Sequence, residues 1–157
     1  MKKYSCQQAL HALAAYCSKS ERCISDVTQK LNDWEIPDEE QKYILKQLQK
    51  ERFLDESRFC RAFVNDKSKY AKWGLYKIKY ELRKRSVAEA LISEALQTID
   101  PEEKKMQLIQ LLEAKKKTVK GKTSVEIAQK LMRFAFSRGF SQEMIESALE
   151  VVQKERG

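Results

Sequence analysis

The sequence predicts an all-α protein of three tandem three-helix repeats that form an elongated, curved array. Only four glycines and two prolines occur in 157 residues, so few residues interrupt a composition that favours helices. An apolar pattern with a central break also returns about every fifty residues, with its breaks at residues 34–36, 85–87 and 138–140. Periods of this length are typical of stacked units, each too small to bury its own apolar face.

The repeat also sets the expected domain boundaries. Copies two and three align without a gap, whereas the first has three extra residues after its break, around Pro37. A surface turn can absorb such an insertion. We therefore assign the three repeats to residues 1–54, 55–100 and 101–157.

The first repeat is expected to hold three helices. Apolar spacing predicts a helix over residues 5–18, and the segment Ser18-Lys19-Ser20 offers a cap for a second helix that runs to about Asp33. A third helix should begin near Asp38, because Pro37 marks a helix start.

The second repeat follows the same plan. Asp55 can cap its first helix, and the next two are expected at about 73–85 and 88–98. Asp100 and Pro101 then combine a cap with a proline at the first helical position, which makes a seventh helix from here well supported. Two more are expected at about 124–138 and 141–155, the last capped by Ser141.

Charge is unevenly distributed along the chain. Residues 1–56 carry 9 basic and 10 acidic groups, residues 57–100 carry 10 and 5, and residues 101–157 carry 12 and 8. Because an ordinary soluble surface mixes both signs, this excess predicts that the second and third repeats meet an anionic partner such as a nucleic acid.

Other functions find little support in the sequence. The four cysteines form no C-x-x-C pair and His11 is the only histidine, so we expect reduced packing cysteines, no metal and no cofactor. Since no apolar run approaches the roughly 20 residues of a membrane span and no secretion signal is evident, we expect a cytoplasmic protein. His11 has no recognisable nucleophile beside it, so we expect no enzymatic activity.

Several phrases in the sequence resemble the RecX family of recombination regulators. They are FLDESRF at 53–59, RAFV at 61–64, Trp73-Gly74 and the break Arg85-Ser86-Val87, preceded by ALHALAAYCSKSER and followed by RFAFSRGFSQEMIESAL. The resemblance covers roughly residues 7–150. It implies binding to the RecA recombinase filament on DNA and modulation, usually inhibition, of its ATPase and strand exchange, hence a role in DNA repair, homologous recombination and the SOS response.

The chain also departs from the family pattern. At positions where the family often has glycine or a characteristic signature residue, this sequence has Glu35, Ser86, Glu56 and Cys60, and only Gly139 keeps the helix-ending glycine. We therefore expect the first two breaks either to form a different turn or to carry about 1 kcal/mol of backbone strain.

The helix expected at 73–85 carries the main candidate surface. At 100° per residue, Leu75, Ile78 and Leu82 form a core face. The opposite face carries lysine, arginine and tyrosine side chains. Its cations suit phosphates, and its aromatic rings can stack on bases or pack in a protein groove. Alternatively, Tyr76, Tyr80 and Trp73 fill the contact between repeats. The candidate residues on and beside the opposite face are Lys72, Tyr76, Lys77, Tyr80, Arg83 and Lys84.

A second basic stretch spans residues 115–123 and contains the further candidates Lys115, Lys120 and Lys122. Its ending Gly-Lys-Thr resembles a phosphate-binding loop, but Lys116 stands where that loop needs its first glycine. We expect a basic loop that either contacts the partner or simply links two helices.

Two alternatives concern nucleic acids alone. Sequence-specific operator binding is disfavoured, because the last helix of repeat two carries Glu89 and Glu94 and no cation. A helical module that binds DNA through phosphates without RecA is the main alternative. In either case we expect a monomer.

Overall fold

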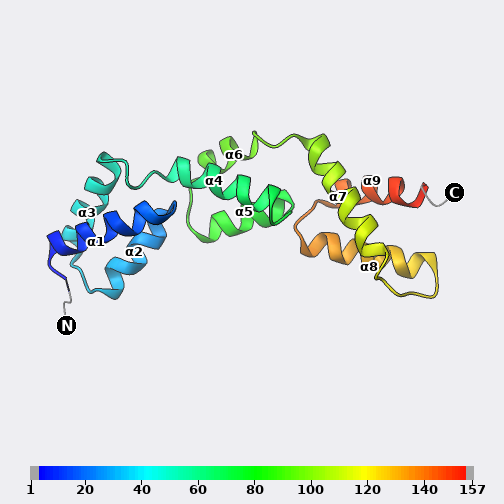
Figure 1. The fold of residues 1–157 in the computed structure, drawn as a ribbon, viewed down its shortest axis with the longest axis horizontal. Coiled ribbons are helices and arrows are strands. Elements are labelled where there is room, and N and C mark those ends of the chain that lie inside the picture. Colours follow the sequence, from blue (N-terminus) through cyan, green and yellow to red (C-terminus); the bar gives the residue numbers. More distant parts are fainter. Residues whose placement is uncertain (1–3, 155–157) are drawn as a thin grey trace. The chain divides into compact units, whose positions relative to one another are not determined.

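The computed structural model describes residues 4–154, which contain nine helices and no strand (Figure 1). This confirms the predicted all-α class. In chain order the helices are α1 (Cys6–Lys19), α2 (Ile24–Asp33), α3 (Asp38–Lys50), α4 (Glu56–Lys69), α5 (Leu75–Lys84), α6 (Glu89–Leu96), α7 (Pro101–Lys116), α8 (Ser124–Ser137) and α9 (Gln142–Lys154).

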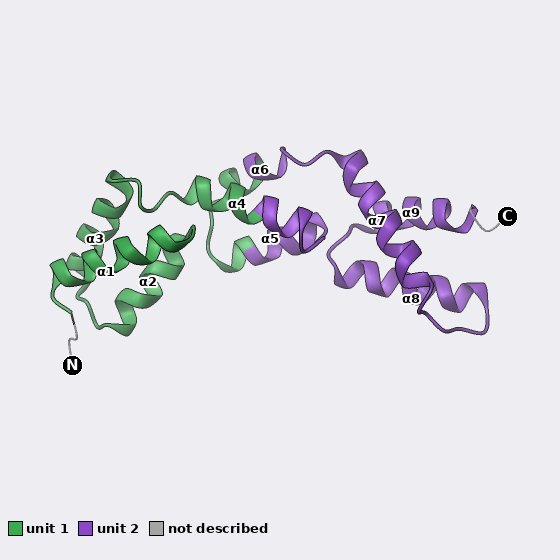
Figure 2. Ribbon diagram, in the orientation of Figure 1, with its two compact units in different colours: residues 1–63, 82–93 green, residues 64–81, 94–157 purple. Residues whose placement is uncertain are grey.

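The chain divides into two compact units (Figure 2). Of the described residues, unit 1 holds 4–63 and 82–93, and unit 2 holds 64–81 and 94–154. The helices α4, α5 and α6 each contribute residues to both units. The compact units therefore follow a different division from the sequence repeat, whose boundaries stay a prediction.

Unit 1 is built around the apolar faces of α1, α2 and α3. Their buried side chains form one cluster with the residues that follow α2 and α3: Ala9, Leu13, Cys17, Val27, Leu31, Ile36, Ile44, Leu48 and Leu54. Full burial of each leucine or isoleucine contributes roughly 1.5–3 kcal/mol. A carboxylate from outside the first repeat completes this unit, because Glu56 accepts a hydrogen bond of 2.8 Å from the backbone N–H of Ile24, at the positive end of α2.

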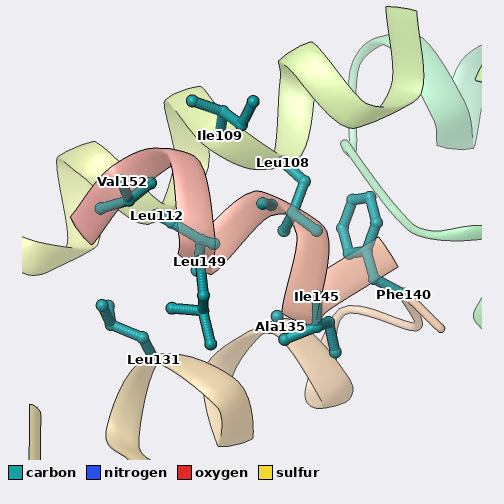
Figure 3. Packing of buried hydrophobic residues seen from close by; sticks show 10 residues of the cluster. Leu108, Ile109, Leu112, Leu131, Ala135, Phe140, Ile145, Leu149 and Val152 are labelled. Carbon is teal, nitrogen blue, oxygen red and sulfur yellow. The ribbon is translucent and has the colours of Figure 1, made fainter. Parts of the chain in front are cut away.

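Unit 2 has its core between α7, α8 and α9 (Figure 3). The figure shows the apolar side chains of these three helices converging on one another, with Phe140 following the turn after α8. Partly buried side chains, among them Val119 and Met144, pack against its edge. The fully buried members Leu108, Leu112 and Ile145 come from positions that the apolar periodicity assigns to the core.

Three of the predicted helix caps are confirmed. The side chain of Asp55 accepts from the N–H of Arg58 at 3.0 Å, Asp100 accepts from Glu102 at 3.1 Å, and Ser141 accepts from Met144 at 3.1 Å. The cap expected in Ser18-Lys19-Ser20 is wrong. The second helix begins only at Ile24, after Cys23, whose own N–H donates to Asp26, so Ser20 lies too far upstream to reach it.

The three sequence breaks form the same turn. Glu35, Ser86 and Gly139 all have left-handed backbone conformations, with φ of 54°, 58° and 90°. In each turn the next residue donates its N–H to a carbonyl five positions earlier, as in the bonds Ile36–Leu31, Val87–Leu82 and Phe140–Ala135 of 3.0–3.2 Å. The alternative of a different turn is thus wrong, and the non-glycine residues carry the strain.

Candidate nucleic-acid and protein interface

The candidate surface begins at the turn between α4 and α5. Lys72 has a left-handed conformation, with φ of 59°, and the N–H of Trp73 donates to the carbonyl of Lys67 at 2.9 Å. This hydrogen bond spans six positions, one more than in the three breaks, so this turn is wider than theirs. It leaves Lys72 exposed at the tip of the turn and folds Trp73 back against the end of α4.

The start of α5 is fixed by backbone contacts with the turn after α8, within unit 2. The N–H of Gly74 donates to the carbonyl of Arg138 at 2.6 Å, and that of Tyr76 donates to Gly139 at 3.0 Å. These bonds pair donors that a helix start otherwise leaves unsatisfied with acceptors at a helix end. A Cβ at Gly74 would lie 2.3 Å from the backbone of Gly139, so two glycines permit this approach.

Two tyrosines of α5 project into solvent. The exposed fractions of Tyr76 and Tyr80 are 60% and 61%, so neither ring is buried in a contact between repeats, although Tyr76 lines the edge of one with α7 and α9. The ammonium group of Lys79 lies 5.9 Å from the centre of the Tyr76 ring. Exposed aromatic rings beside cations can stack on bases or enter a groove of another protein.

Trp73 is half-buried and lies between two cations. The ammonium groups of Lys67 and Lys77 are 5.0 and 4.6 Å from the centre of its ring, within the range of cation–π attraction. The structure therefore brings the predicted Lys77 together with two residues outside the predicted site. Lys67 lies in α4, six residues before Trp73, which follows that helix. Because the two residues do not share a helix, apolar periodicity could not predict that they meet.

Arg83 and Lys84 lie at the end of α5, in unit 1. Arg83 binds Glu89 through two hydrogen bonds, of 2.6 and 3.2 Å, although both side chains are largely exposed. A guanidinium engaged in this way must leave its carboxylate before it can bind a phosphate with the same atoms. Lys84 is exposed.

The basic stretch divides between the end of α7 and a loop. Lys115 is exposed on α7, and its ammonium lies 5.2 Å from the centre of the Phe134 ring of α8. Lys120 and Lys122 are exposed in the loop, where the N–H of Lys122 donates to Glu126 at 3.1 Å. Lys130 also donates to the carbonyl of Lys120. Specific hydrogen bonds therefore order part of this loop.

One charged residue of unit 2 escaped the sequence reasoning. Lys104 is buried on α7, where its ammonium contacts Ser68 and Gln107. The available signal was its position four residues before Leu108, which extends the apolar stripe of the helix.

The remaining expectations from the sequence concern metal sites, His11 and membrane-spanning helices. In residues 4–154, no group of three or more His, Cys, Asp or Glu side chains is placed to hold a metal ion. His11 is exposed on α1. Within the same range, no helix combines the length and apolar character that crossing a membrane requires.

Three-helix units that recur along one chain define the class of helical-repeat proteins. Sequence models of the second and third three-helix domains of RecX match residues 55–96 and 102–149. The regulatory protein RecX of Haemophilus ducreyi is 31% identical over 157 residues, covering 99% of each chain. The chain therefore belongs to the RecX family of regulatory proteins.

Other relatives are longer. The regulatory protein RecX of Halalkalibacterium halodurans is 31% identical over 143 residues, which cover 90% of this chain but 53% of that one. The regulatory protein RecX of Bacillus cytotoxicus is 24% identical over 150 residues, which cover 96% of this chain and 56% of that one. This chain thus spans about half the length of these two relatives.

Solved structures share the fold. A crystal structure of a regulatory protein RecX matches with a TM-score of 0.85 at 23% identity, covering 92% of this chain and 73% of that one. RecX from Lactobacillus salivarius matches with a TM-score of 0.85 at 17% identity, covering 94% and 96%. At such identities the likeness concerns the arrangement of helices.

Proposed function

We propose that this protein binds the RecA recombinase filament on DNA and inhibits its ATPase and strand exchange. Membership of a family of regulatory proteins supports a regulatory role. The exposure of Tyr76 and Tyr80, with Lys79 beside the Tyr76 ring, is the observation that carries the choice of surface. The proposal assigns no catalytic step to this chain, which acts in the cytoplasm as a monomer.

The proposed mechanism is a difference in affinity between two forms of the filament. A ligand shifts a conformational equilibrium only as far as it binds one state more tightly than the other. Contacts from Tyr76, Tyr80 and Lys77 would favour a filament geometry that turns ATP over slowly. Phosphates or acidic filament surfaces would be contacted by the other exposed lysines of the candidate site, Lys72, Lys84, Lys115, Lys120 and Lys122.

The test is RecA-driven ATP hydrolysis on single-stranded DNA, with and without this protein. We expect the wild type to lower the rate and the double variant Tyr76→Ala with Tyr80→Ala to need about tenfold more protein, because exposed interface tyrosines often carry a large share of binding energy. The matched control is Tyr43→Ala, since Tyr43 is 44% exposed on α3. No effect of the wild type at severalfold excess would remove the proposal.

A second candidate function is direct binding to DNA without RecA. The two lysines near the Trp73 ring favour it, because single strands are bound by cations that contact the backbone and aromatic rings that stack on bases. It predicts affinity that falls steeply with salt, by roughly 0.9 log units per phosphate neutralised and per log unit of salt.

Charge reversal separates the two functions. The variant Lys77→Glu with Lys84→Glu is compared with Lys46→Glu, an exposed lysine on α3. Direct DNA binding predicts that only the first variant loses affinity for free DNA. If that affinity collapses while inhibition of RecA survives, the basic residues are incidental to regulation and the aromatic surface carries it.

A further inference from the structure

A buried ammonium group distinguishes unit 2. Lys104 is only 3% exposed, and its Nζ donates to the backbone carbonyl of Ser68 at 3.2 Å, the hydroxyl of Ser68 at 2.9 Å and Oε1 of Gln107 at 2.7 Å. The same ammonium lies 5.5 Å from the centre of the Phe140 ring. All of these partners are neutral, so among residues 4–154 the positive charge is solvated by dipoles and a ring face and has no carboxylate partner.

Lys104 also lines a cavity of about 230 Å³ between the first part of α5, α7 and the start of α9, and all of its lining residues belong to unit 2. Leu75, Phe140 and Met144 provide apolar walls. The polar lining consists of Tyr76, Lys79 and Ser141 in addition to Lys104. The cavity is thus a largely apolar pocket with two lysines, Lys104 and Lys79, among its lining residues.

Charge and size restrict what the pocket can hold. Burial lowers the pKa of Lys104 to about 8, so the group is still mostly protonated at neutral pH. A buried cation without a carboxylate partner is costly, and a ligand that supplies one recovers part of that cost. The volume is below the roughly 300–1,000 Å³ of typical cofactor and drug sites, so the matching group is about the size of one side chain.

We propose that this pocket binds a carboxylate carried on a short apolar stem, with the ammonium group of Lys104 as its counter-ion. The stem contacts Leu75, Phe140 and Met144. The carboxylate replaces one neutral acceptor of Lys104, so that the new hydrogen bond joins two groups of opposite charge. A nucleobase of similar size offers only neutral acceptors and leaves the charge uncompensated. The pocket shares Tyr76 with the surface proposed for RecA, but the inference does not depend on RecA binding.

Lysine side-chain NMR on the full chain tests the proposal directly. Phenylacetate is the probe, and phenylacetamide is the neutral control of the same shape. Because a neighbouring anion favours the charged form, we expect phenylacetate to raise the pKa of Lys104 by about one pH unit or more, and the amide to leave it unchanged. An equal response to both probes, or a pKa that phenylacetate does not move, overturns the proposal.

Two variants locate the charge responsible. Lys104→Met removes the buried cation and should weaken phenylacetate binding at least tenfold, whereas Lys79→Met, which removes the other lysine of the pocket, should change it less. Equal binding by Lys104→Met and wild type contradicts the proposal. Since a core variant can misfold, the wild-type titration is the deciding measurement, and the helical circular dichroism of each variant is checked first.

Further probes identify the source of the carboxylate. A short peptide with a central glutamate flanked by leucines, compared with its glutamine counterpart, represents an acidic segment of a protein. A shift of Lys104 with the glutamate peptide assigns the site to a protein partner, and a shift with phenylacetate alone assigns it to a small carboxylic acid. A shift produced by a thymidine oligonucleotide and by neither carboxylate overturns the proposal in favour of nucleic acid.

Discussion

The turns after α2 and α8 have nearly the same geometry but different residues at the critical position. Glu35 and Gly139 both adopt left-handed conformations, and the following Ile36 and Phe140 are both buried and hydrogen-bonded to the preceding helix. Glu35 is exposed, whereas Gly139 is buried. A Cβ at Gly139 would lie 2.3 Å from Cβ of Lys77 and 2.6 Å from its backbone nitrogen.

The difference separates two reasons for glycine. A left-handed conformation costs a residue with a Cβ roughly 1–2 kcal/mol, which a well-packed turn can carry. Close approach of another backbone leaves no space for a Cβ at all. At Glu35 only the left-handed conformation favours glycine. At Gly139 the close approach of α5 also excludes a Cβ.

The largest effect is expected from Gly139→Ala. The added Cβ must displace the start of α5 and also holds the unfavourable φ of 90°. Overpacking and strain together should lower the free energy of unfolding by about 2–5 kcal/mol. Urea denaturation followed by circular dichroism measures this loss.

The matched control for that variant is Glu35→Ala, which exchanges one residue with a Cβ for another at an exposed turn. We expect a much smaller loss than for Gly139→Ala, because no Cβ is added and the backbone conformation is unchanged. Equal losses in the two variants would show that the turn conformation, and not the contact with α5, decides the residue.

Gly74→Ala tests the same contact from the other side. The new Cβ would lie 2.3 Å from the backbone carbon and oxygen of Gly139, and the short hydrogen bond from Gly74 to Arg138 would lengthen. Since Gly74 carries no unfavourable φ, we expect a smaller loss, of about 1–3 kcal/mol. The double variant with Gly139→Ala should lose less than the sum, because both substitutions break one contact.

Lys104 provides a perturbation of unit 2 that spares the turn. Its folded pKa of about 8 lies below the roughly 10.4 of an unfolded lysine, so the unfolded chain binds more protons between these values. Stability should therefore rise by on the order of 1–2 kcal/mol from pH 8 to pH 10 as the folded group becomes neutral.

Other groups titrate in the same range, so that measurement needs a reference. Burial raises the pKa of the Cys17 and Cys23 thiols, which lowers stability as pH rises and opposes the effect of Lys104. The difference between wild type and Lys104→Met in chemical denaturation isolates the lysine. A difference that does not depend on pH contradicts the assignment.

The smallest effect is expected from Glu35→Gly. Glycine removes the strain of the left-handed residue but loses more conformational freedom on folding. The two terms nearly cancel, and we expect a gain of about 0.5 kcal/mol in thermal or urea denaturation. A gain well above this value would mean that the left-handed conformation of Glu35 costs more than the usual value of roughly 1–2 kcal/mol.

Local signals predicted most of the fold. The helices follow from apolar periodicity, and Asp55, Asp100 and Ser141 are caps because their oxygens reach N–H groups two or three residues away. The start of α2 was missed, since one of its partners is Glu56, 32 positions along the chain. The breaks were located correctly, but sequence alone did not show that Glu35 and Ser86 would accept the glycine conformation.

The candidate site was predicted less completely. Periodicity indicated that Tyr76 and Tyr80 lie opposite the core face, and both are exposed. It did not reveal that Arg83 is engaged by Glu89 or that Lys67 joins Trp73, because these contacts depend on how segments meet in space. The burial of Lys104 depends on Ser68, 36 positions away, which no local pattern encodes.

The middle repeat completes structures on both sides of it. Glu56, just beyond the first repeat, supplies the carboxylate at the start of α2, while Gly74 and Tyr76 donate to the turn after α8. Deletion of this segment would therefore remove hydrogen-bond partners from the start of α2 and from the turn after α8 at the same time.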